Sequence, residues 1–222
     1  MNTVNKLYDS LADHVVRNRG EICAILGRLL LETSARLDYL MTAKRNSFKH
    51  FVLIGYRPEK EQLKDLRAKA KMRPLVPIER RMLNSIRSRL NKDGITIKQL
   101  LANKQWDLDG KSFRQLLSKE MEWGYAYGFG ASSHFVHGDW RDLSYFHLIR
   151  EGRFYRPKLQ YNRSDPRYVC PITELCLRTL HRYIRWLRAD PDNFVRPIVA
   201  QLIATTRALD QAHEAQISST KT

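Results

Sequence analysis

The sequence predicts an all-α protein, a helical bundle built on two long helices with additional basic helices. Apolar residues recur at helical spacing through almost the whole chain. Alternating, strand-like runs bounded by turn residues are hard to find. The length of 222 residues, with 43% hydrophobic residues and only 10 Gly and 8 Pro, is that of a globular protein rather than a disordered or fibrous one.

The first half of the chain contains the first long helix, over residues 22–41, whose apolar residues follow one face. A shorter amphipathic segment precedes it and ends at Gly20. Prolines and the pair Asp93-Gly94 then separate a series of shorter helices. These helices are predicted over residues 45–56, 58–72, 78–90 and 95–103.

The second half is predicted to open with the second long helix, over residues 112–136. The segment His137-Gly138-Asp139 is expected to end it. Two more helices are predicted to follow, over residues 172–188 and 193–212.

The domain organisation follows from these elements. We expect residues 1–150 to form a helical bundle domain that carries a polar site. Residues 151–215 are predicted to form a basic helical extension packed on the bundle, and residues 216–222 a loose tail.

The charge of the chain is strongly basic and unevenly distributed. Lys and Arg outnumber Asp and Glu by 39 to 23, which gives a net charge of +16 and a pI near 10. Residues 44–93 hold 15 basic and 5 acidic side chains, and residues 150–190 hold 10 and 4. These two stretches account for the whole surplus, which indicates a basic surface and a polyanionic partner rather than scattered solvated charges.

Nucleic acid is the polyanion that the basic stretches fit best. Tyrosines such as Tyr155 and Tyr161 are interleaved with arginines. Aromatic planes stack on unpaired bases, so RNA or a single strand is favoured as the partner over a duplex whose base edges are read. The alternative is that each basic helix is only a solvated face. The residues expected to contact nucleic acid are Lys69, Lys71, Arg80, Arg81, Arg87, Arg153, Arg156, Arg163, Arg182 and Arg185.

Several classes of protein are not expected. Three cysteines without a C-x-x-C pair suggest neither a disulfide framework nor a cysteine-built zinc site. The first ten residues show no signal-peptide pattern, and the apolar run over 22–31 is short and contains Arg28. We therefore expect a cytoplasmic protein with no membrane span. Neither a P-loop nor a dinucleotide fingerprint is present, and no cofactor is expected.

A polar motif closes the predicted second long helix. Ser133 and His137 are four residues apart and therefore share one helix face. A parallel row of small residues, Gly124, Gly128 and Ser132, would let a neighbouring helix approach closely.

The first long helix carries a second polar motif, with Arg28, Glu32 and Arg36 on one face at four-residue steps. In a structural interpretation they form a surface ion-pair ladder. In a functional interpretation Glu32 orients a histidine while Arg28 faces an anionic group.

These motifs together resemble a known family. Arg28-x3-Glu32 in a helix that ends Leu37-Asp38-Tyr39-Leu40, followed by Tyr127 and then by the segment from Ser133 to Asp139, resembles the bacterial domain of unknown function 5677 family. The resemblance covers about residues 20–150. It implies a helical fold and directs attention to the same polar residues, whereas the basic C-terminal part lies outside it.

A weaker similarity is to the HEPN superfamily of helical, metal-independent ribonucleases, marked by R-x4-to-6-H. Arg45-Asn46-Ser47-Phe48-Lys49-His50 matches that string, although it lies early in the chain, and the late His137-Gly138 has Ser132 in place of the arginine. The similarity implies a homodimer. It also implies that His50 or His137 is the general base, with Arg45 or Arg28 as electrostatic partner and Glu32 as orienting group.

Two other kinds of chemistry are weaker candidates. His134, His137 and Asp139, with Glu32, supply ligand types for a metal, but histidines at a helix end are more often structural, and no metal is predicted. Ser133 as a nucleophile activated by His137 is the second candidate, but no nucleophile elbow precedes this serine.

The first functional hypothesis is an RNA-acting protein, in its sharpest form a metal-independent endoribonuclease of a bacterial toxin–antitoxin or antiphage system, with a protein or nucleic-acid partner from that system. The alternative is a non-catalytic nucleic-acid-binding or assembly module. In that case Arg28, Glu32, Ser133 and His137 form a buried polar network that fixes helix register.

Overall fold

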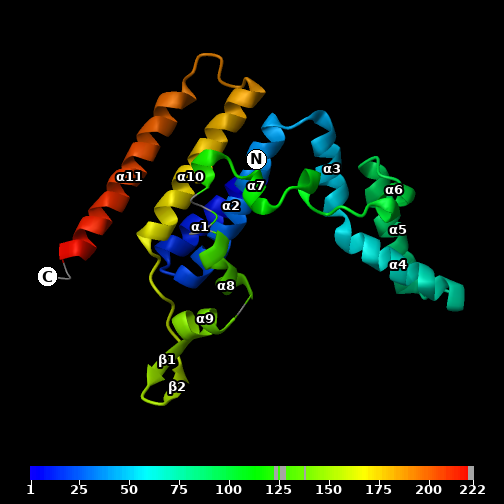
Figure 1. Ribbon diagram of the computed structural model, residues 1–222, viewed down its shortest axis with the longest axis horizontal. Helices are drawn as coiled ribbons and strands as arrows, with labels where there is room; N and C mark the ends of the chain where they lie inside the picture. Colours follow the sequence, from blue (N-terminus) through cyan, green and yellow to red (C-terminus); the bar gives the residue numbers. More distant parts are fainter. Residues whose placement is uncertain (123–124, 126–128, 138, 220–222) are drawn as a thin grey trace. The chain divides into compact units, whose positions relative to one another are not determined.

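The computed structural model describes residues 1–122, 125, 129–137 and 139–219, and it confirms the all-α fold class (Figure 1). Within these residues a two-stranded hairpin is the whole of the β-structure. None of the described helices has the length and apolarity that crossing a membrane requires.

The chain divides into two compact units. Unit 1 contains Met1–Thr42 and Phe113–Thr222, and unit 2 contains Ala43–Ser112. This division by contacts is a different one from the predicted division near residue 150. It arises because α10 (Pro166–Leu187) packs directly on α2 (Gly20–Thr42), so the C-terminal helices share the core of the first long helix.

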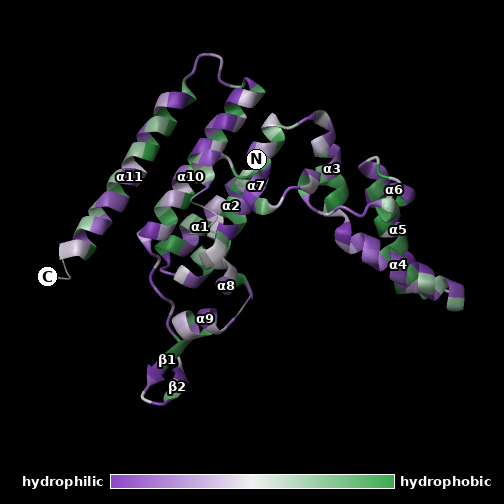
Figure 2. Cartoon of the chain, in the orientation of Figure 1, coloured by the Kyte–Doolittle hydropathy of each residue, from purple (hydrophilic) through white to green (hydrophobic). Residues whose placement is uncertain are grey.

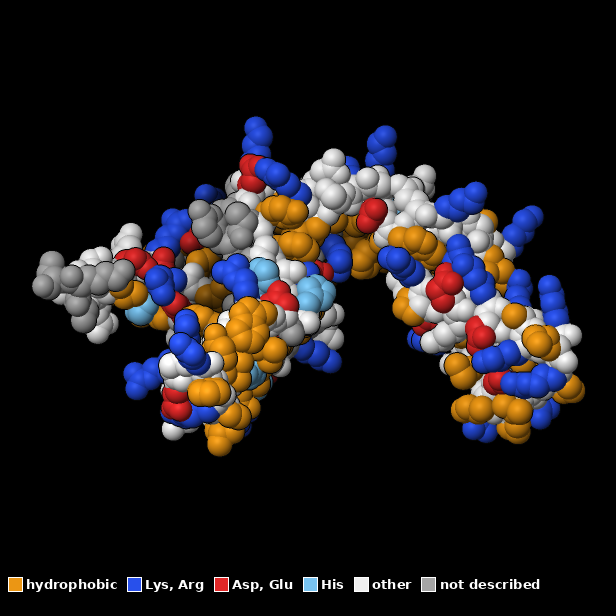
Figure 3. Space-filling view, turned by 60° about the horizontal axis from the view of Figure 1, so that its bottom comes forward, with side chains coloured by type: hydrophobic (Ala, Val, Ile, Leu, Met, Phe, Trp, Pro, Cys, Tyr) orange, Lys and Arg blue, Asp and Glu red, His pale blue; other side chains and the backbone are white. Residues whose placement is uncertain are grey.

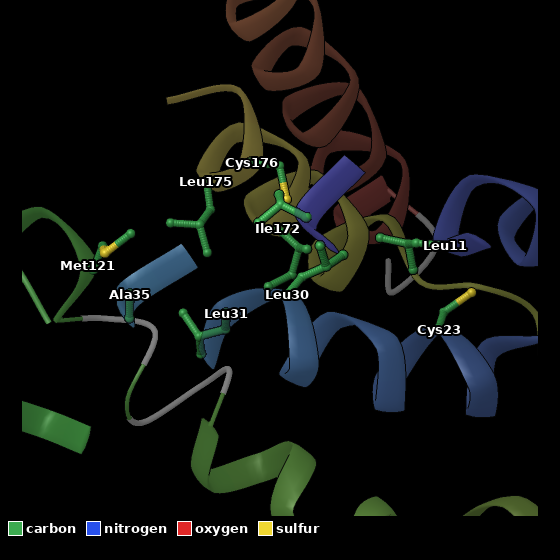
Figure 4. Packing of buried hydrophobic residues seen from close by; sticks show 10 residues of the cluster. Leu11, Cys23, Leu30, Leu31, Ala35, Met121, Ile172, Leu175 and Cys176 are labelled. Carbon is green, nitrogen blue, oxygen red and sulfur yellow. The ribbon is translucent and has the colours of Figure 1, made fainter. Parts of the chain in front are cut away.

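The core of unit 1 lies between α1 (Asn2–Val16), α2 and α10, with α11 (Val195–Ser219) packed along α10 (Figures 1 and 4). Apolar residues three or four positions apart on α2 face this core, as their spacing predicts. The tail predicted to be loose from residue 216 is helical through Ser219. The buried cluster consists of Val4, Leu11, Cys23, Leu30, Leu31, Ala35, Met121, Ile172, Leu175 and Cys176.

A glycine allows the close approach of α10 to α2. A Cβ atom at Gly27 would lie 2.6 Å from Cε1 of Tyr168, which is shorter than any real contact of this kind. The Tyr168 hydroxyl donates a hydrogen bond to the carbonyl of Ala24 at 2.8 Å. Any larger residue at position 27 would push this tyrosine away from α2.

The prediction of one continuous helix over residues 112–136 is wrong. The segment contains α7 (Phe113–Leu116), a 3-10 turn (Lys119–Met121) and α8 (Ala131–His137). The helix stops because Ser118 has an extended backbone, with φ −68° and ψ 160°. Serine and glycine are weak helix formers, so the helical periodicity of the apolar residues does not suffice to continue the helix. Gly124 and Gly128, which the predicted row of small residues includes, lie outside the described residues.

A β-hairpin that the sequence did not predict follows α9 (Trp140–Asp142) and a π-helical turn (Leu143–His147). Strands β1 (Leu148–Glu151) and β2 (Phe154–Pro157) pair antiparallel. Gly152 has φ +62°, as the first central residue of a type II′ turn requires.

Unit 2 is helical and has its own core. It contains α3 (Arg45–Gly55), α4 (Arg57–Met72), α5 (Pro77–Lys92), α6 (Ile97–Ala102) and a 3-10 turn (Leu108–Gly110), close to the predicted helices. Figure 2 shows that α4 is mostly hydrophilic, with few apolar positions to bury. The buried apolar residues are Leu63, Leu66, Ile86, Leu90, Ile95 and Leu100.

Polar contacts set the ends of the helices in unit 2. At the start of α6, Thr96 and Gln99 form a reciprocal capping box. The ammonium of the buried Lys60 donates to the carbonyl of Asn103 at 2.5 Å and lies 5.1 Å from the ring centroid of Trp106. A single lysine thus connects α4 to the chain that leaves α6.

Candidate functional site

The predicted ladder on α2 is present. Nε of Arg28 lies 3.0 Å from Oε1 of Glu32, and Nη2 of Arg36 lies 3.3 Å from Oε2 of the same carboxylate. The Arg28 side chain is only 10% exposed and covers the ring of Phe129, with 4.3 Å between its Cζ and the ring centroid. Arg28 and Glu32 are therefore held rigidly, as either a structural network or a preorganised anion site requires.

The other half of the predicted site lies on α8, which packs against α2. The side chain of Ser133 is partly buried and that of His137 is exposed. Among the described residues, no hydrogen bond joins Glu32 to Ser133 or His137. The structure thus brings the two helices together without showing a shared polar site. Tyr127 and Gly138 of the motif lie outside the described residues.

His134 and Asp139 form the clearest polar contact near this site. Nδ1 of His134 hydrogen-bonds Oδ2 of Asp139, and Nε2 lies 3.3 Å from Nη1 of Arg141. Asp139 is also the N-cap of α9, because its Oδ1 accepts from the backbone N–H groups of Arg141 and Asp142. The hydrogen bond from His134 is the main cause that lowers the pKa of Asp139.

Asp139 thus starts α9 and is joined to His134 of α8. Within the part of the chain that the structure describes, no group of three or more metal-ligating side chains is found.

The HEPN-like string lies at the start of α3. The side chain of Arg45 lies outside what the structure describes. Nδ1 of His50 accepts a hydrogen bond from the backbone N–H of Asp109 at 3.0 Å, and Oδ1 of Asp109 lies 3.2 Å from the same nitrogen. Asp109 has φ +52°, so His50 anchors a strained turn. The Nδ1 lone pair is thereby unavailable to take a proton from a substrate.

A comparison with known protein families identifies the family of this chain. The family model described as "Family of unknown function (DUF5677)" matches residues 2–154. The chain belongs to this family. No curated protein and no solved structure matches this chain.

The DUF5677 match includes all of unit 2, which holds most of the net positive charge. Residues 43–112 contain 18 Lys and Arg against seven Asp and Glu. In the view of Figure 3, Lys and Arg side chains project from many points of this unit.

The carboxylates of α4 and α5 are each engaged by a nearby cation. Glu59 pairs with Arg89, Glu61 with Lys64, and Asp65 with Lys69, at N–O distances between 2.7 and 2.9 Å. Glu79 accepts two hydrogen bonds from Arg73, at 2.7 and 2.8 Å, and one from the backbone of Val76. Lys69, one of the predicted contact residues, is thus held in an ion pair.

The outer face of α5 is left without a negative charge. Arg80, Asn84, Arg87 and Asn91 follow one another at steps of four, three and four residues, and Arg81 and Ser88 flank them. All six are exposed, whereas Glu79, Ile86 and Leu90 face the unit's interior. No carboxylate pairs with Arg80, Arg81 or Arg87 among the residues that the structure describes. The sequence analysis missed Asn84, Ser88 and Asn91, which the same helical spacing could have identified.

The predicted contact residues in the second basic stretch differ among themselves. Nη2 of Arg182 lies 2.5 Å from Oδ2 of the buried Asp38, and Arg156 pairs with Glu151. Arg153, Arg163 and Arg185 are exposed. Among the predicted contact residues of this stretch, only these three are exposed and have no carboxylate paired with them in the described part of the chain, as is the case for Arg80, Arg81 and Arg87.

Proposed function

We propose that this chain binds nucleic acid through the outer face of α5, with RNA as the expected ligand. The observation that carries the proposal is the set of exposed Arg80, Arg81 and Arg87 among amides and a hydroxyl, on a helix whose single carboxylate, Glu79, is engaged by Arg73. Guanidinium groups contact phosphates and release their counterions, and amide side chains donate to phosphates or bases.

Cleavage of the bound RNA is the sharper form of the first hypothesis, and the site geometry favours binding alone. Nδ1 of His50 is used by the turn at Asp109, which leaves only Nε2 to exchange a proton, and Arg28 is engaged by Glu32. A structural polar network on α2 explains the presence of Arg28 and Glu32 without assigning them a catalytic role. The HEPN-like activity and the homodimer stay predictions.

The test compares two triple variants that lose the same charge. One is Arg80→Ala, Arg81→Ala, Arg87→Ala. The matched control is Lys49→Ala, Lys98→Ala, Lys104→Ala, which removes three exposed cations from α3, from α6 and from the segment after α6. Binding of a labelled RNA oligonucleotide is measured by fluorescence anisotropy over a series of salt concentrations.

The expected result follows from counterion release. The slope of log K against log salt becomes shallower by about 2 in the α5 variant, because each phosphate contact to a single strand contributes about 0.7. Its affinity at low salt falls roughly 10- to 100-fold, whereas the control keeps most of the wild-type affinity. Equal losses in both variants would show a non-specific effect of net charge and overturn the proposal.

Cleavage of the labelled RNA is measured in the same samples. Incubation in EDTA and then in Mg²⁺ or Mn²⁺, with His50→Ala and His137→Ala alongside, is expected to leave the RNA intact. Cleavage in EDTA that one histidine substitution abolishes would instead establish the ribonuclease.

A further inference from the structure

The β-hairpin of unit 1 and the neighbouring α9 expose large aromatic side chains. Trp140 is 56% exposed, Tyr155 46% and Phe154 79%. Trp140 contacts Tyr155 edge to face, with 5.3 Å between the ring centroids. In Figure 3, where this end of unit 1 comes forward, hydrophobic side chains lie at the surface beside Lys and Arg.

The strand register places a cation on the same face as these rings. Arg150 lies directly opposite Tyr155, and directly opposed residues of an antiparallel pair project to the same side. Nε of Arg150 donates to the carbonyl of Gly152 at 3.2 Å, which holds the guanidinium at the turn. Tyr155 and Arg150 therefore share one face of the hairpin, and Trp140 of α9 contacts this face through Tyr155.

The carboxylates around this face are already engaged. Glu151 pairs with Arg156, and Asp139 with His134. Asp142 is buried and lies 3.6 Å from His147. Arg153, in the turn, is exposed, and no carboxylate pairs with it among the described residues. The occupant favoured by this charge distribution is an anion that also carries flat, apolar rings.

We propose that this face of the hairpin, formed by Trp140, Tyr155 and Arg150, is a stacking platform for unpaired bases of a single-stranded nucleic acid. The inference rests on the proposed function, since it presumes a nucleic-acid ligand, and it adds the strandedness of that ligand. Bases in a single strand can leave their neighbours and stack on exposed rings while arginine contacts the phosphates, whereas bases in a duplex are already stacked.

The experiment compares alanine and phenylalanine at the same positions. Trp140→Ala and Tyr155→Ala remove a ring, and Trp140→Phe and Tyr155→Phe keep one. The matched control is Trp186→Ala, which removes a tryptophan of nearly equal exposure, 57%, from α10. Each variant is titrated with a labelled single-stranded RNA oligonucleotide and with a blunt RNA duplex of the same length, after circular dichroism has confirmed its helicity.

The proposal predicts a loss confined to single strands. Affinity for the single-stranded RNA falls about fivefold or more in each alanine variant, as loss of one stacked base would cause. The phenylalanine variants and Trp186→Ala keep the wild-type affinity, and duplex binding is unchanged throughout.

Other outcomes identify which claim has failed. Equal losses for single strand and duplex, or wild-type binding by both alanine variants while the α5 triple variant loses affinity, would overturn the platform and leave the proposed function standing. If the wild-type chain binds neither RNA, both proposals fall.

Discussion

Unit 2 and helix α10 of unit 1 are both rich in arginine, yet their cations face different partners. On α10, Arg178 lies 2.7 Å from Glu174, which also pairs with Arg207 of α11, and Arg182 lies 2.5 Å from Asp38 of α2. On α5, Arg80 and Arg87 project from a face without carboxylates. Arg182 of α10 and Arg207 of α11 hold helices together through Asp38 and Glu174, whereas Arg80 and Arg87 of α5 remain available to a ligand.

This difference shows the limit of charge counting. A segment's net charge states how many cations it carries, but not how many of them pair with carboxylates from distant parts of the chain. Asp38 is in a stretch that is neutral in sum, and it nevertheless neutralises one of the predicted contact residues. The second basic stretch therefore offers a smaller cationic surface than its surplus predicts.

The largest expected effect tests whether the two units are stabilised by separate cores. Leu31 and Leu63 are both fully buried, one in each core. Replacing either with alanine is expected to lower the free energy of unfolding of its own unit by about 2–5 kcal/mol, through lost apolar burial and a residual cavity. Hydrogen exchange with mass spectrometry should show faster exchange in the mutated unit alone. Equal loss of protection in both units for both variants would contradict this separation.

A smaller effect separates the two uses of arginine. Arg182→Ala removes the ion pair with a buried carboxylate, and we expect it to lower stability by about 1–3 kcal/mol because Arg182 itself is partly exposed. Its affinity for RNA should stay close to that of the wild type. Arg87→Ala should do the opposite, with weaker RNA binding and an unchanged melting temperature. Both properties are measured on the same preparations, by thermal denaturation and anisotropy. The comparison fails if Arg182→Ala weakens binding as much as Arg87→Ala does.

Much of the fold is predictable because helical spacing is a local property. The first long helix and the helices of unit 2 were predicted close to their observed bounds, and in unit 2 prolines and the pair Asp93-Gly94 mark helix ends. The continuous helix over 112–136 was predicted wrongly for the same reason. Apolar periodicity continues across Ser118, but the backbone there does not stay helical.

The candidate site was harder to predict than the helices. The ladder of Arg28, Glu32 and Arg36 follows from four-residue spacing alone. The pairing of His50 with Asp109 joins residues 59 positions apart, so no local pattern reveals it. The hairpin was missed because its strands are four residues long, and only Glu151-Gly152 marks the turn.

The smallest expected effect concerns the carboxylate that Arg73 neutralises in unit 2. Hydrogen bonds from Arg73, and next from the backbone of Val76, lower the pKa of Glu79 to about 2 from an ordinary value of 4.5. A lowered pKa in the folded state means that the ionised form stabilises the fold. This stabilisation is fully present above about pH 4.5 and is lost as the pH falls towards 2.

The variant Glu79→Gln tests this dependence. It should melt a few degrees below the wild type at neutral pH, and the difference should vanish as the pH approaches 2. Glu61→Gln is the matched control, because Glu61 makes only an exposed ion pair with Lys64 on the same helix and should follow the wild-type profile. A difference between Glu79→Gln and the wild type that persists unchanged down to pH 2 would show that the glutamate acts by its shape and hydrogen bonds rather than by its charge.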